Sequence, residues 1–109
     1  MRESDLYVAQ RLTAILLAPL VLIHLAVIVY AVQDGLSATE ILARTRSSGV
    51  WAWFYSVFVI AAALHGTIGL RSVAAEFLSW RGRSLDLAAA CFGLSLIVLG
   101  ARAVAAVVL

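Results

Sequence analysis

Three long apolar segments constrain the fold of this 109-residue chain more than any other feature. Residues 12–32 and 50–70 contain no charged side chain, and residues 85–109 contain only Asp86 and Arg102. A helix needs about 20 predominantly apolar residues to cross the hydrocarbon core of a bilayer. The segments are too long for barrel strands and lack a two-residue alternation. The sequence therefore predicts an all-α membrane protein with three transmembrane helices.

The composition excludes the other common classes of protein. Hydrophobic residues make up 64% of the chain and charged residues 13%, whereas a soluble domain is about half apolar and about a quarter charged. One cysteine cannot support a disulfide-stabilised secreted domain. The net charge is +2, but the eight basic residues are scattered arginines, which does not indicate nucleic-acid binding. We expect a single membrane domain over residues 1–109.

The distribution of arginine predicts the orientation of the spans, because cytoplasmic loops carry the excess of basic residues. The side of the N-terminus and the second loop would hold five arginines: Arg2, Arg11, Arg71, Arg81 and Arg83. The other side would hold three: Arg44, Arg46 and Arg102. We therefore expect the N-terminus in the cytoplasm and the C-terminus outside.

Local signals refine the boundaries of the helices. Ser37 and Glu40 have the spacing of a capping box, which predicts a short helix over residues 38–45 on the outer face. Pro19 is expected to kink or loosen the first span. The second helix should continue to about Ser79, with Gly82 as its stop signal.

The two histidines of the chain both lie inside apolar segments, where an ionisable group is a functional candidate. His65 shares a helix face with Ala61 and Gly69, one turn away on either side. Such small neighbours would leave room for a flat porphyrin beside an iron ligand. The alternative is that they allow close helix packing, with His65 as a polar contact between helices.

His24 has bulky neighbours and is the weaker candidate. It could bind haem, or it could be hydrogen-bonded to a neighbouring helix or to a carbonyl freed by Pro19. His24 lies 13 residues from Arg11, and His65 lies six residues from Arg71. The two rings would differ in depth by about 10 Å, too much for one iron. The opposite ligand to His65 should therefore come from another chain.

Arg11 and Tyr7 form a second group at the cytoplasmic rim. They are four residues apart and share a face if the first helix begins before Tyr7. An arginine beside a phenol can hold a polar head group and stabilise an anion. The alternative is a snorkelling arginine and an interfacial tyrosine. Gln10 and Thr13 are equally ambiguous, and Cys91 is expected to be a small buried residue.

Two short motifs resemble the cytochrome b membrane-anchor subunits of succinate dehydrogenase and fumarate reductase. They are QRLTA at residues 10–14 and HGTIGLR at residues 65–71, and the resemblance covers residues 5–80. The second helix of that family carries a haem-ligating histidine, a glycine four residues on, often an arginine six on and an acid eleven on. The matching residues here are His65, Gly69, Arg71 and Glu76.

The resemblance implies a subunit of a succinate:quinone or quinol:fumarate oxidoreductase in the bacterial inner membrane. It implies a multi-subunit helix bundle with a second membrane anchor, an iron–sulfur subunit and a flavoprotein subunit that carries the dicarboxylate site. His65 would ligate haem b, with His24 as a candidate second ligand and Arg71 at a haem propionate. Arg11 and Tyr7 would line the site for ubiquinone or menaquinone.

Two rival functions belong to other classes. One is a haem-free structural anchor of a membrane complex, in which the histidines only hold helices together. The other is a small transporter subunit, which is disfavoured because no acidic residue lies in the middle of a span.

Overall fold

Four helices account for nearly all of residues 2–109, the part of the chain that the computed structural model describes. They are α1 (Glu3–Asp34), α2 (Ala38–Thr45), α3 (Gly49–Phe77) and α4 (Arg83–Val108). Three of them, α1, α3 and α4, are long and apolar enough to cross a membrane. The predicted all-α fold with three spanning helices and a short connecting helix is confirmed.

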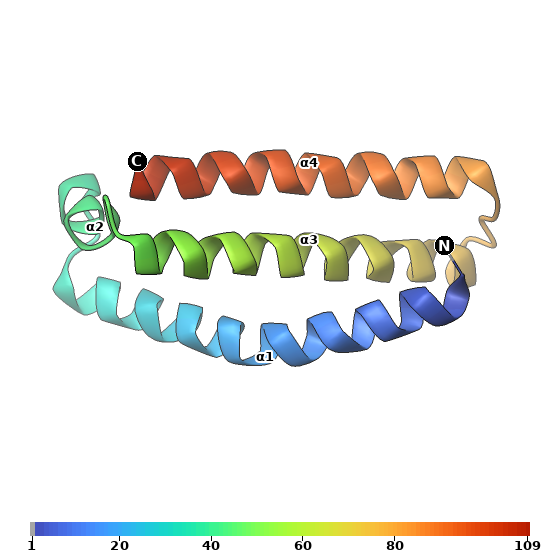
Figure 1. The fold of residues 1–109 in the computed structure, drawn as a ribbon, viewed down its shortest axis with the longest axis horizontal. Coiled ribbons are helices and arrows are strands. Elements are labelled where there is room, and N and C mark those ends of the chain that lie inside the picture. The colour runs from blue at the N-terminus through green and yellow to red at the C-terminus, as the bar shows by residue number, and fades with distance from the viewer. Residues whose placement is uncertain (1) are drawn as a thin grey trace.

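The long helices run antiparallel to their neighbours, with α3 between α1 and α4 (Figure 1). The N-terminal end of α1 and the α3–α4 loop lie at one end of the bundle. The short helix α2 and the end of α4 lie at the other. The large apolar side chains exposed along α1, α3 and α4 suit contact with lipid tails or with other membrane helices. Cys91 also lies on an exposed face, so the expectation that it is buried is wrong.

The first helix, α1, begins well before the apolar segment and continues through the proline. Glu3 and Asp5 lie in its first turn, where negative charge is favourable at the positive end of the helix dipole. Pro19 removes one backbone hydrogen bond without ending the helix. The ribbon of α1 bows along its length, whereas α3 and α4 are straighter (Figure 1).

Glycines of α4 allow it to approach α3 closely. A Cβ atom on Gly93 would lie 2.7 Å from Oγ1 of Thr67. A Cβ atom on Gly100 would overlap the side chain of Val59. The two glycines are seven residues apart and so face α3 together. They set the spacing of the α3–α4 pair.

The end of α3 differs slightly from the expectation. The helix ends at Phe77, and Ser79 adopts a left-handed conformation with φ of 54°. The N–H of Trp80 then donates to the carbonyl of Ala74 at 3.3 Å, which satisfies one of the last carbonyls of the helix. Gly82, with φ of 89°, immediately precedes α4, so it opens the next helix and does not stop α3.

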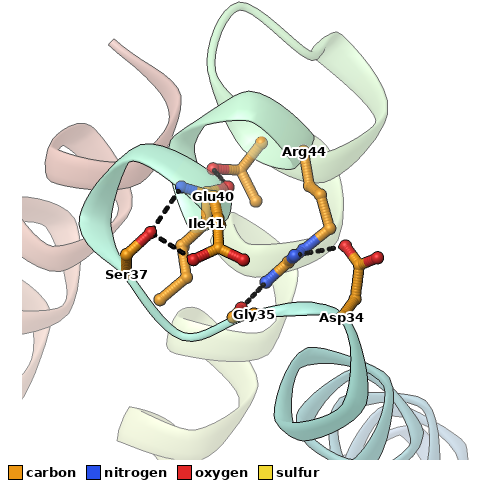
Figure 2. A network of polar contacts seen from close by, with 7 residues as sticks. Asp34, Gly35, Ser37, Glu40, Ile41 and Arg44 are labelled. Carbon is orange, nitrogen blue, oxygen red and sulfur yellow. Dashed lines mark hydrogen bonds and ion pairs between the residues drawn. The ribbon is translucent and has the colours of Figure 1, made fainter.

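Half of the predicted capping box is present at the start of α2 (Figure 2). The N–H of Glu40 donates to Oγ of Ser37 at 3.2 Å. Among the described residues, the Glu40 carboxylate accepts from the Ser37 hydroxyl in place of the Ser37 backbone N–H. Arg44, in the last turn, donates to Asp34 at 2.7 Å and to the carbonyl of Gly35 at 2.9 Å. These contacts fix α2 against the end of α1.

The other side of α2 caps the end of α4. The Thr45 hydroxyl donates to the carbonyl of Val107 at 2.6 Å. The N–H of Ser47 donates to the carbonyl of Val108 at 2.8 Å. The last carbonyls of a helix have no partners within that helix, so α2 and the residues after it supply them.

Candidate functional site

The imidazole of His65 is held against α1 by Thr13. Oγ1 of Thr13 lies 3.2 Å from Nδ1 of His65 and 2.8 Å from the carbonyl of Ala9. Thr13 is 8% exposed and His65 is half-buried. Within residues 2–109, Nε2 of His65 has no hydrogen-bond partner. Nδ1 is thus engaged inside the chain, and Nε2 is the ring atom left for a ligand.

The small residues beside His65 are packed against α1. Ala61 is 3% exposed and forms a buried cluster with Leu20 and Phe54. A Cβ atom on Gly69 would lie 3.2 Å from Nε2 of Gln10. The expectation that these positions leave a gap for a porphyrin is therefore wrong for this chain. Ala61 and Gly69 serve the close packing of two helices, which was the alternative interpretation.

The donor set of His65 nevertheless fits a haem iron. Metal-bound histidines usually donate their second ring N–H to a neighbouring acceptor, as Nδ1 can do toward Thr13. No group of three or more His, Cys, Asp or Glu in residues 2–109 could hold a bare metal ion. Haem needs only axial ligands from protein, because the porphyrin supplies the other nitrogens. A macrocycle would have to reach the exposed part of the ring from outside the α1–α3 contact.

His24 lies farther along the same contact, toward α2. Its ring meets Phe58 and Tyr55 edge-on, with centroids 5.1 Å and 6.1 Å away. It also lines an apolar cavity of about 360 Å³ together with Thr45 and Val104. The hydrogen bond considered for His24 is not present among the described residues.

The two histidines are too far apart to share one iron. His65 meets α1 at Thr13, which is 11 residues from His24, and His24 meets α3 at Phe58, which is seven residues from His65. At 1.5 Å per residue these offsets correspond to about 10–16 Å along the helices. Each ring therefore belongs to a separate environment.

Arg11 and Tyr7 lie together near the N-terminal end of α1. The guanidinium carbon of Arg11 is 5.7 Å from the centroid of the Tyr7 ring, and both residues are exposed. Helix α1 begins at Glu3, so the condition for a shared face is met. Arg11 is about 200° around the helix from Thr13. Its side chain therefore starts on the side of α1 turned away from α3.

Tyr7 also borders a cavity between α1 and α3. This cavity has a volume of about 430 Å³ and is lined in part by Tyr7, Gln10 and Ser72. Oε1 of Gln10 is buried and has no hydrogen-bond partner among the described residues. Tyr7, Gln10 and Ser72 thus line a cavity at this end of the bundle, whereas the His65 ring lies against Thr13 of α1.

Arg71 joins three helices at the same end. Its Nε donates to Asp86 of α4 at 3.0 Å, and its Nη1 lies 3.3 Å from Oε1 of Glu3 in α1. The guanidinium is thus held by two carboxylates, and its role at a haem propionate stays a prediction. Glu76 lines a polar cavity of about 290 Å³ with Arg71 and Arg81.

Thr13 is the residue of this site to which the sequence assigns no role. Thr13 was one of several ambiguous polar residues in the first span, and it is 52 residues away from His65 in the sequence. Thr13 lies seven residues, or two helical turns, before Leu20. This spacing is the signal in the sequence that Thr13 faces the interior of the bundle. Both residues are buried in α1.

The comparisons with known proteins agree with the architecture. A model of the succinate dehydrogenase/fumarate reductase transmembrane subunit family matches residues 2–108. No curated protein and no solved structure gives a significant match. The match covers nearly the whole sequence and includes all four helices. This multi-pass membrane chain belongs to the succinate dehydrogenase/fumarate reductase transmembrane subunit family.

Proposed function

We propose that this chain is the haem- and quinone-binding anchor of a bacterial succinate:quinone or quinol:fumarate oxidoreductase. The observation that carries the proposal is the intramembrane His65, whose Nδ1 is engaged by Thr13 while Nε2 is left without a partner in residues 2–109. An imidazole within a span is energetically costly, which makes it a candidate functional group. Family membership makes electron transfer the function to test first.

His65 would hold the iron of haem b through Nε2. A second iron ligand would come from a second membrane anchor, because His24 is about 10–16 Å away along the helices. When bound, haem b supplies one-electron redox chemistry at its iron. The chain's own contribution is to place the imidazole and to exclude water from its Nδ1 side, where Thr13 is buried.

The quinone head group would bind at the exposed pair formed by Arg11 and Tyr7. An arginine is charged at any physiological pH and stabilises negative charge on a reduced oxygen before a proton arrives. Because Arg11 starts on the side of α1 turned away from α3, another subunit would complete this site. The iron–sulfur subunit would deliver electrons there, and a flavoprotein subunit would carry the dicarboxylate chemistry. The N-terminal end of the bundle would then face the cytoplasm.

The test of the haem assignment uses the complete purified complex. His65→Ala should abolish a b-type band in the reduced-minus-oxidised spectrum while subunit stoichiometry is retained. Ser95→Ala is the matched control, because Ser95 is an exposed polar residue in α4 whose hydroxyl donates to the backbone carbonyl of Cys91 in the same helix. A band that survives His65→Ala at full intensity would overturn the assignment.

One observation favours a second candidate function, a haem-free anchor. Ala61 and Gly69 pack against α1, and His65 contacts Thr13 of the same helix, which supports a role for His65 as a polar contact between two helices. In that case the purified wild-type complex would contain flavin and iron–sulfur clusters but no haem. Extraction and quantitation of haem relative to flavin separate the two functions.

A further inference from the structure

We infer that Thr13 is a positioning residue that fixes the tautomer of His65, placing the ring hydrogen on Nδ1 and leaving the lone pair on Nε2. This inference rests on the proposed haem-binding function. Thr13 would act through His65 and would not itself touch the haem.

The inference follows from counting hydrogens around one hydroxyl group. Oγ1 of Thr13 has a single hydrogen and three neighbours: the carbonyl of Ala9 at 2.8 Å, the carbonyl of Gln10 at 3.0 Å and Nδ1 of His65 at 3.2 Å. Both carbonyls can only accept. The shortest contact is of the length preferred by O–H···O bonds. The hydroxyl hydrogen therefore goes to the backbone, and the contact with His65 must use a hydrogen on Nδ1.

Two features of the helices make this arrangement robust. The hydrogen bond from the Thr13 hydroxyl to the carbonyl of Ala9 joins residues four apart in α1, so it does not depend on the position of α3. Thr13 is 8% exposed, so water does not readily replace it as the acceptor for Nδ1. Helix α1 thus presents a fixed acceptor oxygen to α3 at the level of His65. The opposite tautomer would place a hydrogen on Nε2 and prevent that atom from binding iron.

A hydrogen bond from Nδ1 also makes the imidazole a stronger electron donor through Nε2. A stronger donor stabilises ferric over ferrous iron. Removing the acceptor should therefore raise the midpoint potential of the haem and weaken its binding by about 10- to 100-fold, as for other partners that orient metal ligands.

The test compares Thr13→Val with Thr13→Ser in the complete complex. Potentiometric titration of the b-type band and the low-spin ferric EPR spectrum are the readouts. Thr13→Val, which keeps the size and removes the acceptor, should raise the potential and shift the EPR g values. Thr13→Ser, which keeps the hydroxyl, should match the wild type. If Thr13→Val does not assemble, Thr13→Ala carries the same expectation.

The matched control is Thr67→Val. Thr67 is half-buried and its hydroxyl oxygen is buried. It lies two residues from His65 but faces Gly93 of α4, with no hydrogen-bond partner for its hydroxyl in residues 2–109. Its replacement should leave the potential and the EPR spectrum unchanged. A shift as large as that of Thr13→Val would show that the effect is general packing, and would overturn the inference.

The outcomes separate this inference from the proposed function. A b-type band that survives His65→Ala defeats the haem assignment, whatever Thr13 does. Loss of the band in His65→Ala, with a wild-type potential and EPR spectrum in Thr13→Val, leaves the haem assignment standing and overturns the role of Thr13. Failure of Thr13→Ser to match the wild type would also overturn it.

Discussion

Arg71 of α3 donates through Nε to Asp86 of α4 at 3.0 Å, and the same guanidinium pairs with Glu3 of α1. One side chain therefore connects all three long helices at one end of the bundle. Its partners are exposed, and exposed ion pairs contribute about 0.2–1 kcal/mol each. The cluster aligns the helix ends more than it stabilises the fold.

This cluster gives a test of the role of Arg71 at a haem propionate. If Arg71 has only a structural role, Arg71→Gln and Asp86→Asn should cause similar, small losses of thermal stability and no change in the haem spectrum. If Arg71 also binds a propionate, only Arg71→Gln should lower haem retention. Asp86→Asn is the matched control, because it removes the charge of one ion-pair partner of Arg71 while keeping the arginine.

Gly100→Ala should destabilise the α3–α4 pair. The added methyl group would overlap Val59, and overpacking costs about 1–3 kcal/mol, which exceeds the gain of about 1 kcal/mol in helix propensity. Gly66→Ala is the control, because the nearest side chain that its Cβ atom would meet among residues 2–109 is Leu96, at an ordinary 3.7 Å. Thermal unfolding of the complex in detergent measures both. Equal melting temperatures for the two variants would contradict the close-packing account.

Thr45→Val should loosen the end of α4. The change removes the part-buried hydrogen bond to the carbonyl of Val107, and loss of such a bond costs about 0.5–1.5 kcal/mol. Thr45→Ser keeps the hydroxyl and should behave nearly as the wild type. Limited proteolysis at the α2 end of the bundle, compared between the two variants, measures the effect. Equal protection in both would mean that the hydroxyl is unimportant.

His24→Gln should leave the signal of a haem bound at His65 intact. The rings of the two histidines contact different partners, Thr13 in one case and Phe58 in the other. The readouts are haem stoichiometry and EPR of the complex. Loss of one of two haems would identify His24 as a ligand in its own right. Loss of all haem would contradict the separation of the two sites.

A reporter fused after Leu109 should be active outside the cytoplasm if the arginine distribution sets the orientation. A second fusion in the α3–α4 loop, at Gly82, should be active only inside, because that loop lies at the N-terminal end of the bundle (Figure 1). The opposite pattern would move the Arg11–Tyr7 pair to the outer side of the membrane.

The elements of the fold were predictable because their signals are local. A capping box and eight helical residues are contained within residues 37–45, and the structure places α2 over the predicted range. The apolar segment of residues 12–32 located the first span but not its start, since α1 begins at Glu3. Hydropathy indicates which residues can lie in the hydrocarbon core, and it does not indicate where a helix begins. A helix continues into water wherever its first turns are favourable, as with the acidic residues at the start of α1.

The candidate site was predictable only in part, because it depends on how two helices are rotated and aligned. A helical wheel placed Ala61 and Gly69 beside His65 but could not show that α1 fills their positions. Which residue of α1 lies opposite His65 is decided by the sum of many apolar contacts along both helices. The contact between Thr13 and His65 results from all of these apolar contacts together, and a single sequence does not reveal it.

The contact of Thr45 with Val107 spans 62 residues and has a consequence for biosynthesis. The ribosome makes α2 long before the final turn of α4. The donor groups for the carbonyls of that turn can therefore be in place when α4 crosses the bilayer. Insertion of the last helix is complete when the final turn of α4 docks onto these donor groups.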